Sequence, residues 1–169
     1  LRGMKESGTI FAIPTYAFIF TLALAIVVVL TKILIHGGNP LVAGEPRESV
    51  TAVQGVTLFL ILRAFANGCT AMTGVEAVSN GVQAFKSPSP ENANKTLLAM
   101  ALILGSLFLG VTLIARHLGF VPGENSTIPS QLGVEAFGAG TPLFAFLQIM
   151  TAGILILAAN TAFADFPRL

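Results

Sequence analysis

Long apolar runs constrain this chain more than any other feature of its sequence. The run Ile10–Ile35 exceeds the roughly 20 apolar residues with which a helix crosses a bilayer, and Thr96–Ala115 and Pro142–Phe163 are similar in character. Only 10% of the residues are charged, whereas ordinary soluble domains carry roughly 25%. These features predict an all-α membrane protein.

Charge and motif content exclude several other classes of protein. Nine basic and eight acidic residues give a net charge of +1, so we expect no basic surface for nucleic acid. The sequence shows no metal-ligand cluster, phosphate-binding glycine loop or Ser-His-Asp set, so we expect neither an enzyme nor a cofactor. The single cysteine, Cys69, is interpreted as a small packing residue.

Turn-forming and charged stretches divide the chain into predicted spans and loops. Ser49 is expected to cap a helix that begins at Val50, and Thr141 to cap one that begins at Pro142. Polar loops are expected at residues 1–8, 36–48, 86–95 and 118–140. Lys32 is expected to extend toward the membrane surface. Four transmembrane helices follow, over about 10–35, 50–85 (broken near 67–74), 96–116 and 142–163.

Basic residues in the loops predict the orientation in the membrane. One side carries Arg2, Lys5, Lys86, Lys95 and Arg168, and the other side carries Lys32, Arg47 and Arg116. The side richer in lysine and arginine normally faces the cytoplasm. We therefore expect an integral protein of the plasma (inner) membrane with both chain ends in the cytoplasm.

The interrupted run Gln54–Ala84 is the candidate site. Irregular backbone at membrane depth has free N–H and C=O groups that can bind a ligand. A first half-helix ending near Phe65 would direct carbonyl groups at a cation, and a second starting near Thr73 would direct N–H groups at an anion or at the Glu76 carboxylate. Asn67 and Gly68 are expected to support this break, which can therefore hold an ion of either sign.

Polar residues in the break are spaced at helical intervals. Thr70, Thr73 and Glu76 are three residues apart, so they share a face wherever the backbone is helical. Hydroxyl and carbonyl oxygens suit an alkali cation, and a carboxylate can carry a proton. Alternatively, the threonines bond back to their own helix and Glu76 pairs with Arg63. We predict that Thr70, Thr73, Gly74 and Glu76 line an ion or substrate path.

Several motifs resemble the amino acid, polyamine and cation (APC) superfamily of permeases over nearly the whole chain. They are Arg2–Gly8 (RGMKESG), Thr73–Ala77 (TGVEA), Ala84–Pro88 (AFKSP), Asn160-Thr161 and Ala164–Leu169 (ADFPRL). Within this superfamily, the sequences of these motifs are most similar to those of KimA-type potassium importers. The resemblance implies that residues 1–169 form one partial transporter domain, covering the fifth to eighth helices of a LeuT-type inverted-repeat fold.

The same resemblance implies a function for the break. The threonine that matches Thr73 helps to coordinate potassium, and the glutamate that matches Glu76 lies beside the ion path of proton-coupled uptake. The first, third and tenth helices of the superfamily, with their ligands, are missing, so we expect no transport by this chain alone.

The function expected from the resemblance is proton-coupled potassium uptake by alternating access. The alternatives are an amino acid permease of the same superfamily and a small four-helix membrane subunit or scaffold without transport activity. The expected partners are potassium and protons, or an amino acid, together with the lipid bilayer and the missing helices of the parent. A homodimer of the parent is compatible with this reading.

Overall fold

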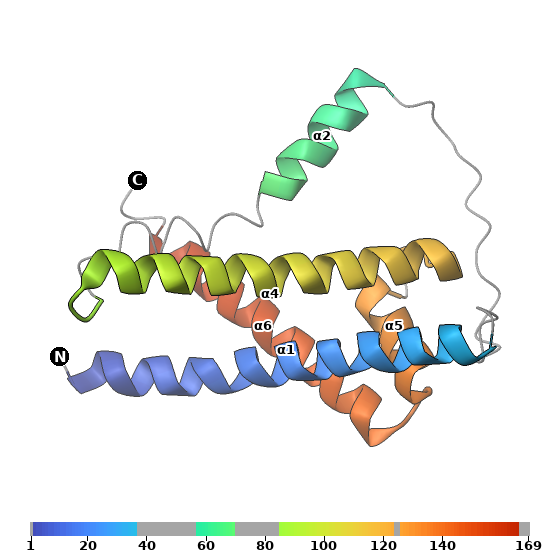
Figure 1. Cartoon of the computed structure of the whole chain (residues 1–169), viewed down its shortest axis with the longest axis horizontal. Helices are drawn as coiled ribbons and strands as arrows, with labels where there is room; N and C mark the ends of the chain where they lie inside the picture. Colours follow the sequence, from blue (N-terminus) through green and yellow to red (C-terminus); the bar gives the residue numbers. More distant parts are fainter. Residues whose placement is uncertain (1, 37–56, 70–84, 124–125, 166–169) are drawn as a thin grey trace. The chain divides into compact units, whose positions relative to one another are not determined.

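The described part of the chain is entirely helical. In a computed structural model, the described residues are 2–36, 57–69, 85–123 and 126–165, with side chains over 12–35, 57–69, 85–123 and 126–159. No strand occurs among these residues, which confirms the predicted all-α class. The helices are α1 (Arg2–His36), α2 (Leu58–Cys69), α4 (Ser89–Leu118), α5 (Ile128–Phe137) and α6 (Pro142–Asp165) (Figure 1).

Three helices within the described residues are long and apolar enough to cross a membrane. They contain the segments Ala12–Ile35, Ser89–Leu118 and Pro142–Ala159, which lie at the predicted spans 10–35, 96–116 and 142–163. The predicted broken span, 50–85, is represented by the shorter apolar helix α2. The rest of that span lies outside the described residues, apart from Thr57 and Phe85.

Two helices extend into polar segments that hydropathy assigns to loops. The predicted loop at 1–8 is wrong from Arg2 onward, because α1 begins there; lysine, glutamate and methionine are good helix formers. The predicted loop at 86–95 is wrong from Ser89 onward, because α4 begins there. Pro90 lies in the first turn of α4, where a missing N–H group removes no helical hydrogen bond.

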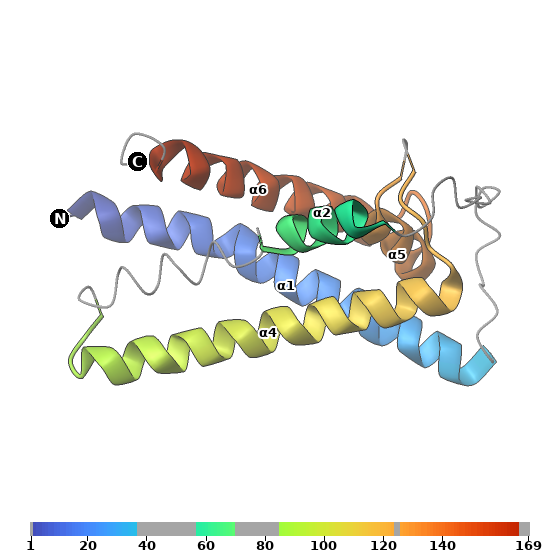
Figure 2. The same ribbon diagram turned by 90° about the horizontal axis from the view of Figure 1, so that it is seen from above.

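The chain divides into two compact units, Leu1–Glu48 with Leu107–Leu169, and Ser49–Ser106. The first unit contains α1, α5, α6 and the end of α4. In it α6 crosses α1 in Figure 1 and runs alongside it in Figure 2, and α5 contacts both. The second unit contains α2 and the first part of α4.

The first unit has an apolar core at one face of α1. Buried side chains recur on α1 at the i, i+3, i+4 and i+7 spacing of a helix face. They belong to one cluster, Leu22, Ala25, Ile26, Val29, Ile114, Leu118, Leu132, Ala136 and Leu147. This cluster therefore holds α1, α5, α6 and the last turns of α4 together.

Gly110 allows α4 and α1 to approach closely within this core. A Cβ atom at Gly110 would lie 2.9 Å from Cγ2 of Ile26, which is buried. We expect Gly110→Val to lower the stability of the protein by about 1–3 kcal/mol, since overpacking a close contact forces backbone shifts. The measurement is the midpoint of thermal unfolding in detergent. Gly105→Val is the matched control, because a Cβ at Gly105 meets nothing within 4 Å; equal shifts for the two variants would contradict the prediction.

Helix α5 occupies part of the segment 118–140, which is wrongly predicted to be a loop. The Thr127 Oγ1 atom accepts a hydrogen bond from the Ser130 N–H group at 3.3 Å, and Pro129 lies in the first turn. Gly138, with φ of +88°, ends the helix. Serine, threonine and asparagine favour both helix caps and turns, so the residues that cap α5 were interpreted as part of a loop.

Helix α6 begins at Pro142, as predicted. The Thr141 Oγ1 atom accepts a hydrogen bond from the Phe144 N–H group at 3.2 Å, so Thr141 is its N-cap. Gly140, with φ of +76°, precedes this cap. The connection between α5 and α6 is therefore short and defined at both ends.

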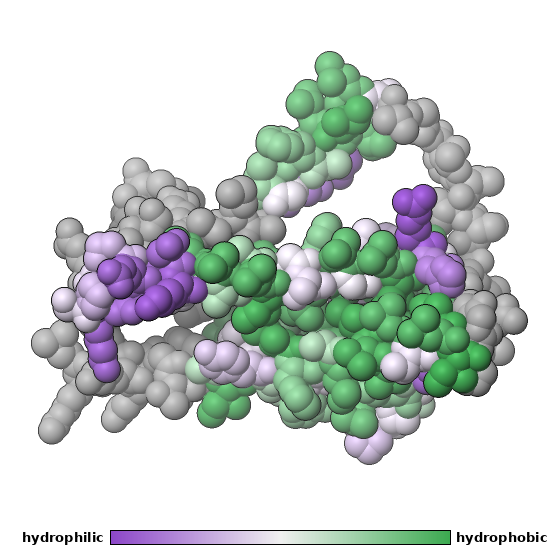
Figure 3. Space-filling view, viewed as in Figure 1, coloured by the Kyte–Doolittle hydropathy of each residue, from purple (hydrophilic) through white to green (hydrophobic). Residues whose placement is uncertain are grey.

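Large apolar side chains remain exposed along the spanning helices. Leu102 and Leu109 of α4 are 64% and 58% exposed. Figure 3 shows hydrophobic residues along much of α4, with hydrophilic residues gathered at its first turns. This surface suits contact with lipid or with further apolar helices.

Candidate functional site

Helix α2 leads directly into the predicted break. Thr57 Oγ1 accepts a hydrogen bond from the Leu60 N–H group at 3.2 Å and caps α2, which begins at Leu58. The predicted cap at Ser49 and helix start at Val50 lie outside the described residues. Helix α2 ends at Cys69 and not near Phe65. Gly68 lies in the last turn of α2. A glycine costs a helix about 1 kcal/mol relative to alanine, and the leucines and alanines earlier in α2 are helix formers that offset this cost.

The sequence-predicted support residues lie within α2. Asn67 and Gly68 are helical and exposed, so Asn67 does not cap a break after Phe65. A Cβ at Gly68 would meet nothing within 4 Å. The predicted break therefore starts no earlier than Thr70, and the support role of both residues stays a prediction.

The residues that carry the predicted chemistry follow α2 immediately. Thr70, Thr73, Gly74 and Glu76 lie outside the described residues, so their role as an ion path also stays a prediction. The last four carbonyl groups of a helix have no partners within that helix, and they carry the negative end of the helix dipole. This end of α2 directly precedes Thr70 and has the electrostatic sign that suits a cation.

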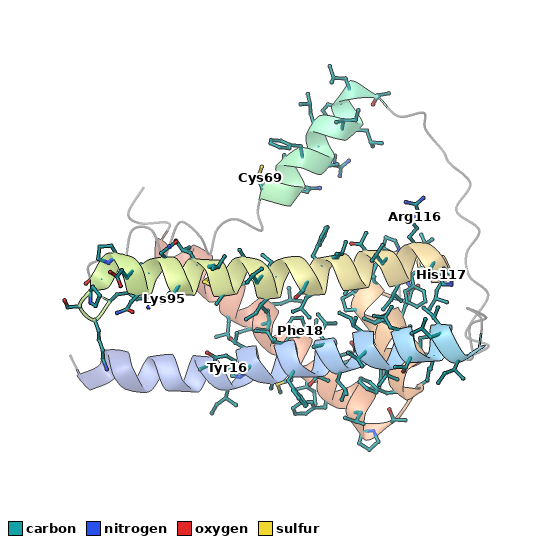
Figure 4. The ribbon with its side chains drawn as sticks, in the orientation of Figure 1. Tyr16, Phe18, Cys69, Lys95, Arg116 and His117 are labelled. Carbon is teal, nitrogen blue, oxygen red and sulfur yellow. The ribbon has the colours of Figure 1, made fainter. Side chains whose placement is uncertain are left out.

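Helix α2 combines an apolar surface with a small polar face. Arg63 and Asn67 are one turn apart, so they share a face, whereas Phe59 and Phe65 are more than 70% exposed. Cys69 is exposed at the end of the helix (Figure 4), which contradicts its assignment as a packing residue. Cys69 is the last residue of α2, and none of the described residues buries it.

Threonine hydroxyls in the described spanning helices bond to their own backbone. Thr21 Oγ1 donates to the Ala17 carbonyl at 2.7 Å, Thr96 Oγ1 to Asn92 at 2.9 Å and Thr151 Oγ1 to Leu147 at 2.8 Å. Such a hydroxyl keeps lone pairs on its oxygen. Back-bonding by Thr70 or Thr73 would therefore be compatible with coordination of a cation.

A second polar cluster, missed by the sequence interpretation, surrounds α5. The Lys32 ammonium group donates to the carbonyl oxygens of Glu135 and Ala136 at 2.7 and 3.1 Å, and its extension toward the membrane surface stays a prediction. Gln148 Nε2 donates to Ser130 Oγ at 3.3 Å. The cap residues of α5, Thr127 and Gly138, were a sequence signal for this helix. The partner of Lys32 was not predictable without the fold.

Comparison with known proteins gives consistent results. The family described as Amino acid permease matches residues 1–169. The chain is 43% identical over 169 residues to the potassium transporter KimA of Bacillus subtilis (strain 168). This alignment covers 100% of the chain and 27% of the relative, so the chain spans about a quarter of the length of the protein it matches.

Both matches extend over every residue, including α2, α5 and the segments between the spanning helices. The relatives are transporters by name, and three described helices have the length and composition of membrane spans. The chain is thus an integral membrane protein with part of the APC superfamily fold. It belongs to the amino acid permease family.

Proposed function

We propose that this chain is the part of a secondary active transporter that contains the fifth to eighth helices, and that the parent takes up potassium together with protons by alternating access. The observation that carries this proposal is the 43% identity to the potassium transporter KimA over the full chain. The parent supplies the remaining helices and the remaining ion ligands. The loop charges support cytoplasmic chain ends and a location in the plasma membrane.

The site chemistry supports a cation as the substrate. The carbonyl end of α2 precedes Thr70, and it has the sign that attracts a positive ion. Thr73 comes four residues after Cys69 in the sequence, and its hydroxyl oxygen is a hard ligand of the kind that alkali ions prefer. Glu76 would carry the proton, because it is the carboxylate of the predicted break.

An amino acid is the second candidate substrate. The family match favours it, since the family is described by amino acid transport. In that case the N–H groups of a second half-helix, starting near Thr73, would bind the substrate carboxylate. Glu76 would then lie beside the substrate amino group.

Uptake by the full-length permease in sealed vesicles distinguishes these substrates. We expect saturable potassium uptake that an inward proton gradient accelerates and that a mixture of amino acids does not inhibit. In Glu76→Gln the acceleration by the gradient should be lost, because glutamine cannot carry a proton. Gln54→Glu, which adds a carboxylate outside the break, serves as the control for altered charge.

Three results would count against the proposal. Uptake of amino acids without uptake of potassium would transfer the function to the second candidate. Unchanged acceleration in Glu76→Gln would remove this residue from proton coupling. Absence of uptake of either substrate by a correctly inserted permease would contradict transport itself.

A further inference from the structure

We propose that Lys32 is a positioning residue that docks α5 on α1, so that these two helices move as one body during transport. Only the consequence for transport rests on the proposed function; the docking itself follows from the geometry. The two helices are far apart in sequence, and Lys32 connects them through hydrogen bonds to the end of α5.

The hydrogen bonds of Lys32 complete the C-terminus of α5. The last carbonyl groups of a helix lack partners within it, and they carry the negative end of the helix dipole. The Val134 carbonyl accepts from the Gly138 N–H group at 2.8 Å, but the chain turns away at Gly138, where φ is +88°. The next two carbonyls, of Glu135 and Ala136, accept from Lys32 instead.

Apolar packing partly shields these hydrogen bonds from water. Val29 lies one turn before Lys32 on the same face of α1, and its side chain is fully buried. Leu132 and Ala136 of α5 are also buried in the same cluster. Hydrogen bonds in such surroundings are electrostatically stronger than hydrogen bonds in water.

Helix α5 is attached to α6 as well. Ser130 Oγ accepts from Gln148 Nε2 at 3.3 Å. The backbone approaches α6 at Gly133, where a Cβ atom would lie 2.9 Å from Leu147 Cδ2. Helix α5 therefore bridges α1 and α6, and any relative movement of α1 and α6 has to loosen one of the two attachments.

The polar contacts indicate which attachment is loosened. Lys32 contributes two hydrogen bonds from a charged donor, whereas Gln148 contributes one long neutral bond. Hydrogen bonds with a charged partner are about twice as strong as neutral ones. Helix α5 should therefore stay with α1 when α1 and α6 separate.

Backbone amide exchange of the full-length permease in lipid nanodiscs tests the docking. In Lys32→Met we expect amides 134–138 to exchange about tenfold faster. Loss of a hydrogen bond to a charged group should raise the population of the locally opened state of α5 by about this factor. Lys32→Arg should restore slow exchange, because its guanidinium also donates two bonds. Gln148→Leu should accelerate exchange less than Lys32→Met does. Lys95→Met is the matched control, since Lys95 is exposed on α4.

Two results would overturn the inference. One is exchange of amides 134–138 that is equally fast in Lys32→Met and Lys95→Met. The other is a larger acceleration in Gln148→Leu, which would place the stronger attachment on α6. If Lys32→Met does not accumulate in the membrane, Lys32→Gln replaces it. Glutamine is an uncharged donor, so Lys32→Gln should accelerate exchange of amides 134–138 less than Lys32→Met would. Exchange in Lys32→Gln that is as slow as in the wild type would overturn the inference.

Transport gives an independent reading of the same residue. We expect Lys32→Met to lower the maximum rate of potassium uptake several-fold, with less than about a twofold change in the half-saturating concentration, because the ion ligands are unchanged. A changed half-saturating concentration at a normal maximum rate would contradict the positioning role. If the wild-type permease transports no potassium, the proposed function fails, and amide exchange still decides whether Lys32 docks α5.

Discussion

Potassium uptake by the full-length permease is expected to fall about 10- to 100-fold when Thr73 is replaced by alanine, the range that corresponds to losing one polar contact to a charged group. Alanine removes the hydroxyl oxygen but keeps the Cβ atom, so the backbone of the predicted break can stay in place. The initial rate of uptake should be measured over a range of potassium concentrations in vesicles with matched amounts of protein. The loss should appear as weaker apparent binding of potassium.

A threonine elsewhere in a spanning helix provides the control for this substitution. Thr31 is exposed on α1, and its hydroxyl donates to the Val28 carbonyl at 2.8 Å. We expect Thr31→Ala to leave uptake within about twofold of the wild type, because surface substitutions away from special features have small effects. Uptake that is unaffected by Thr73→Ala would exclude the ion role of Thr73.

Leu132→Ala is expected to destabilise the packing of α5 by about 2–5 kcal/mol, the range for truncating a buried leucine. Leu132 is fully buried, and its cluster includes Val29 of α1 and Leu147 of α6. The cavity would therefore open where three helices meet. A lower midpoint of thermal unfolding and faster amide exchange throughout residues 128–138 should follow.

The matched control for this truncation is Leu143→Ala. Leu143 lies in the first turn of α6 and is 49% exposed, so truncating it removes fewer contacts and leaves no enclosed cavity. A similar loss of stability in both variants would show that Leu132 is not a special position in the core.

The spanning helices were predictable because apolar length alone determines them. The runs 10–35, 96–116 and 142–163 reappear within α1, α4 and α6. Their polar extensions were not predictable from hydropathy, since the residues before Ile10 and Thr96 are helical through backbone preference and cap geometry. Hydropathy measures how well a segment fits in lipid, and it does not report where a helix ends.

Other features depended on contacts between distant segments. Helix α5 has only ten residues, and its stability comes from burial of Leu132 and Ala136 against other helices, which no local pattern reveals. The role of Lys32 depends on residues more than 100 positions later. In the candidate site, the polar residues were predictable from the interrupted apolar run, whereas the helical state of Asn67 and Gly68 was not, because their weak helix preference is overridden by the preceding residues.

The long sequence separation of this contact also has a consequence for biosynthesis. Lys32 meets the Glu135 carbonyl 103 residues further along the chain, and ribosomes add roughly 5–20 residues per second. A nascent α1 therefore waits on the order of 5–20 s before the end of α5 is synthesised. During that interval α1 has to persist in the membrane without its contacts to α5, and its long apolar run is sufficient for insertion on its own.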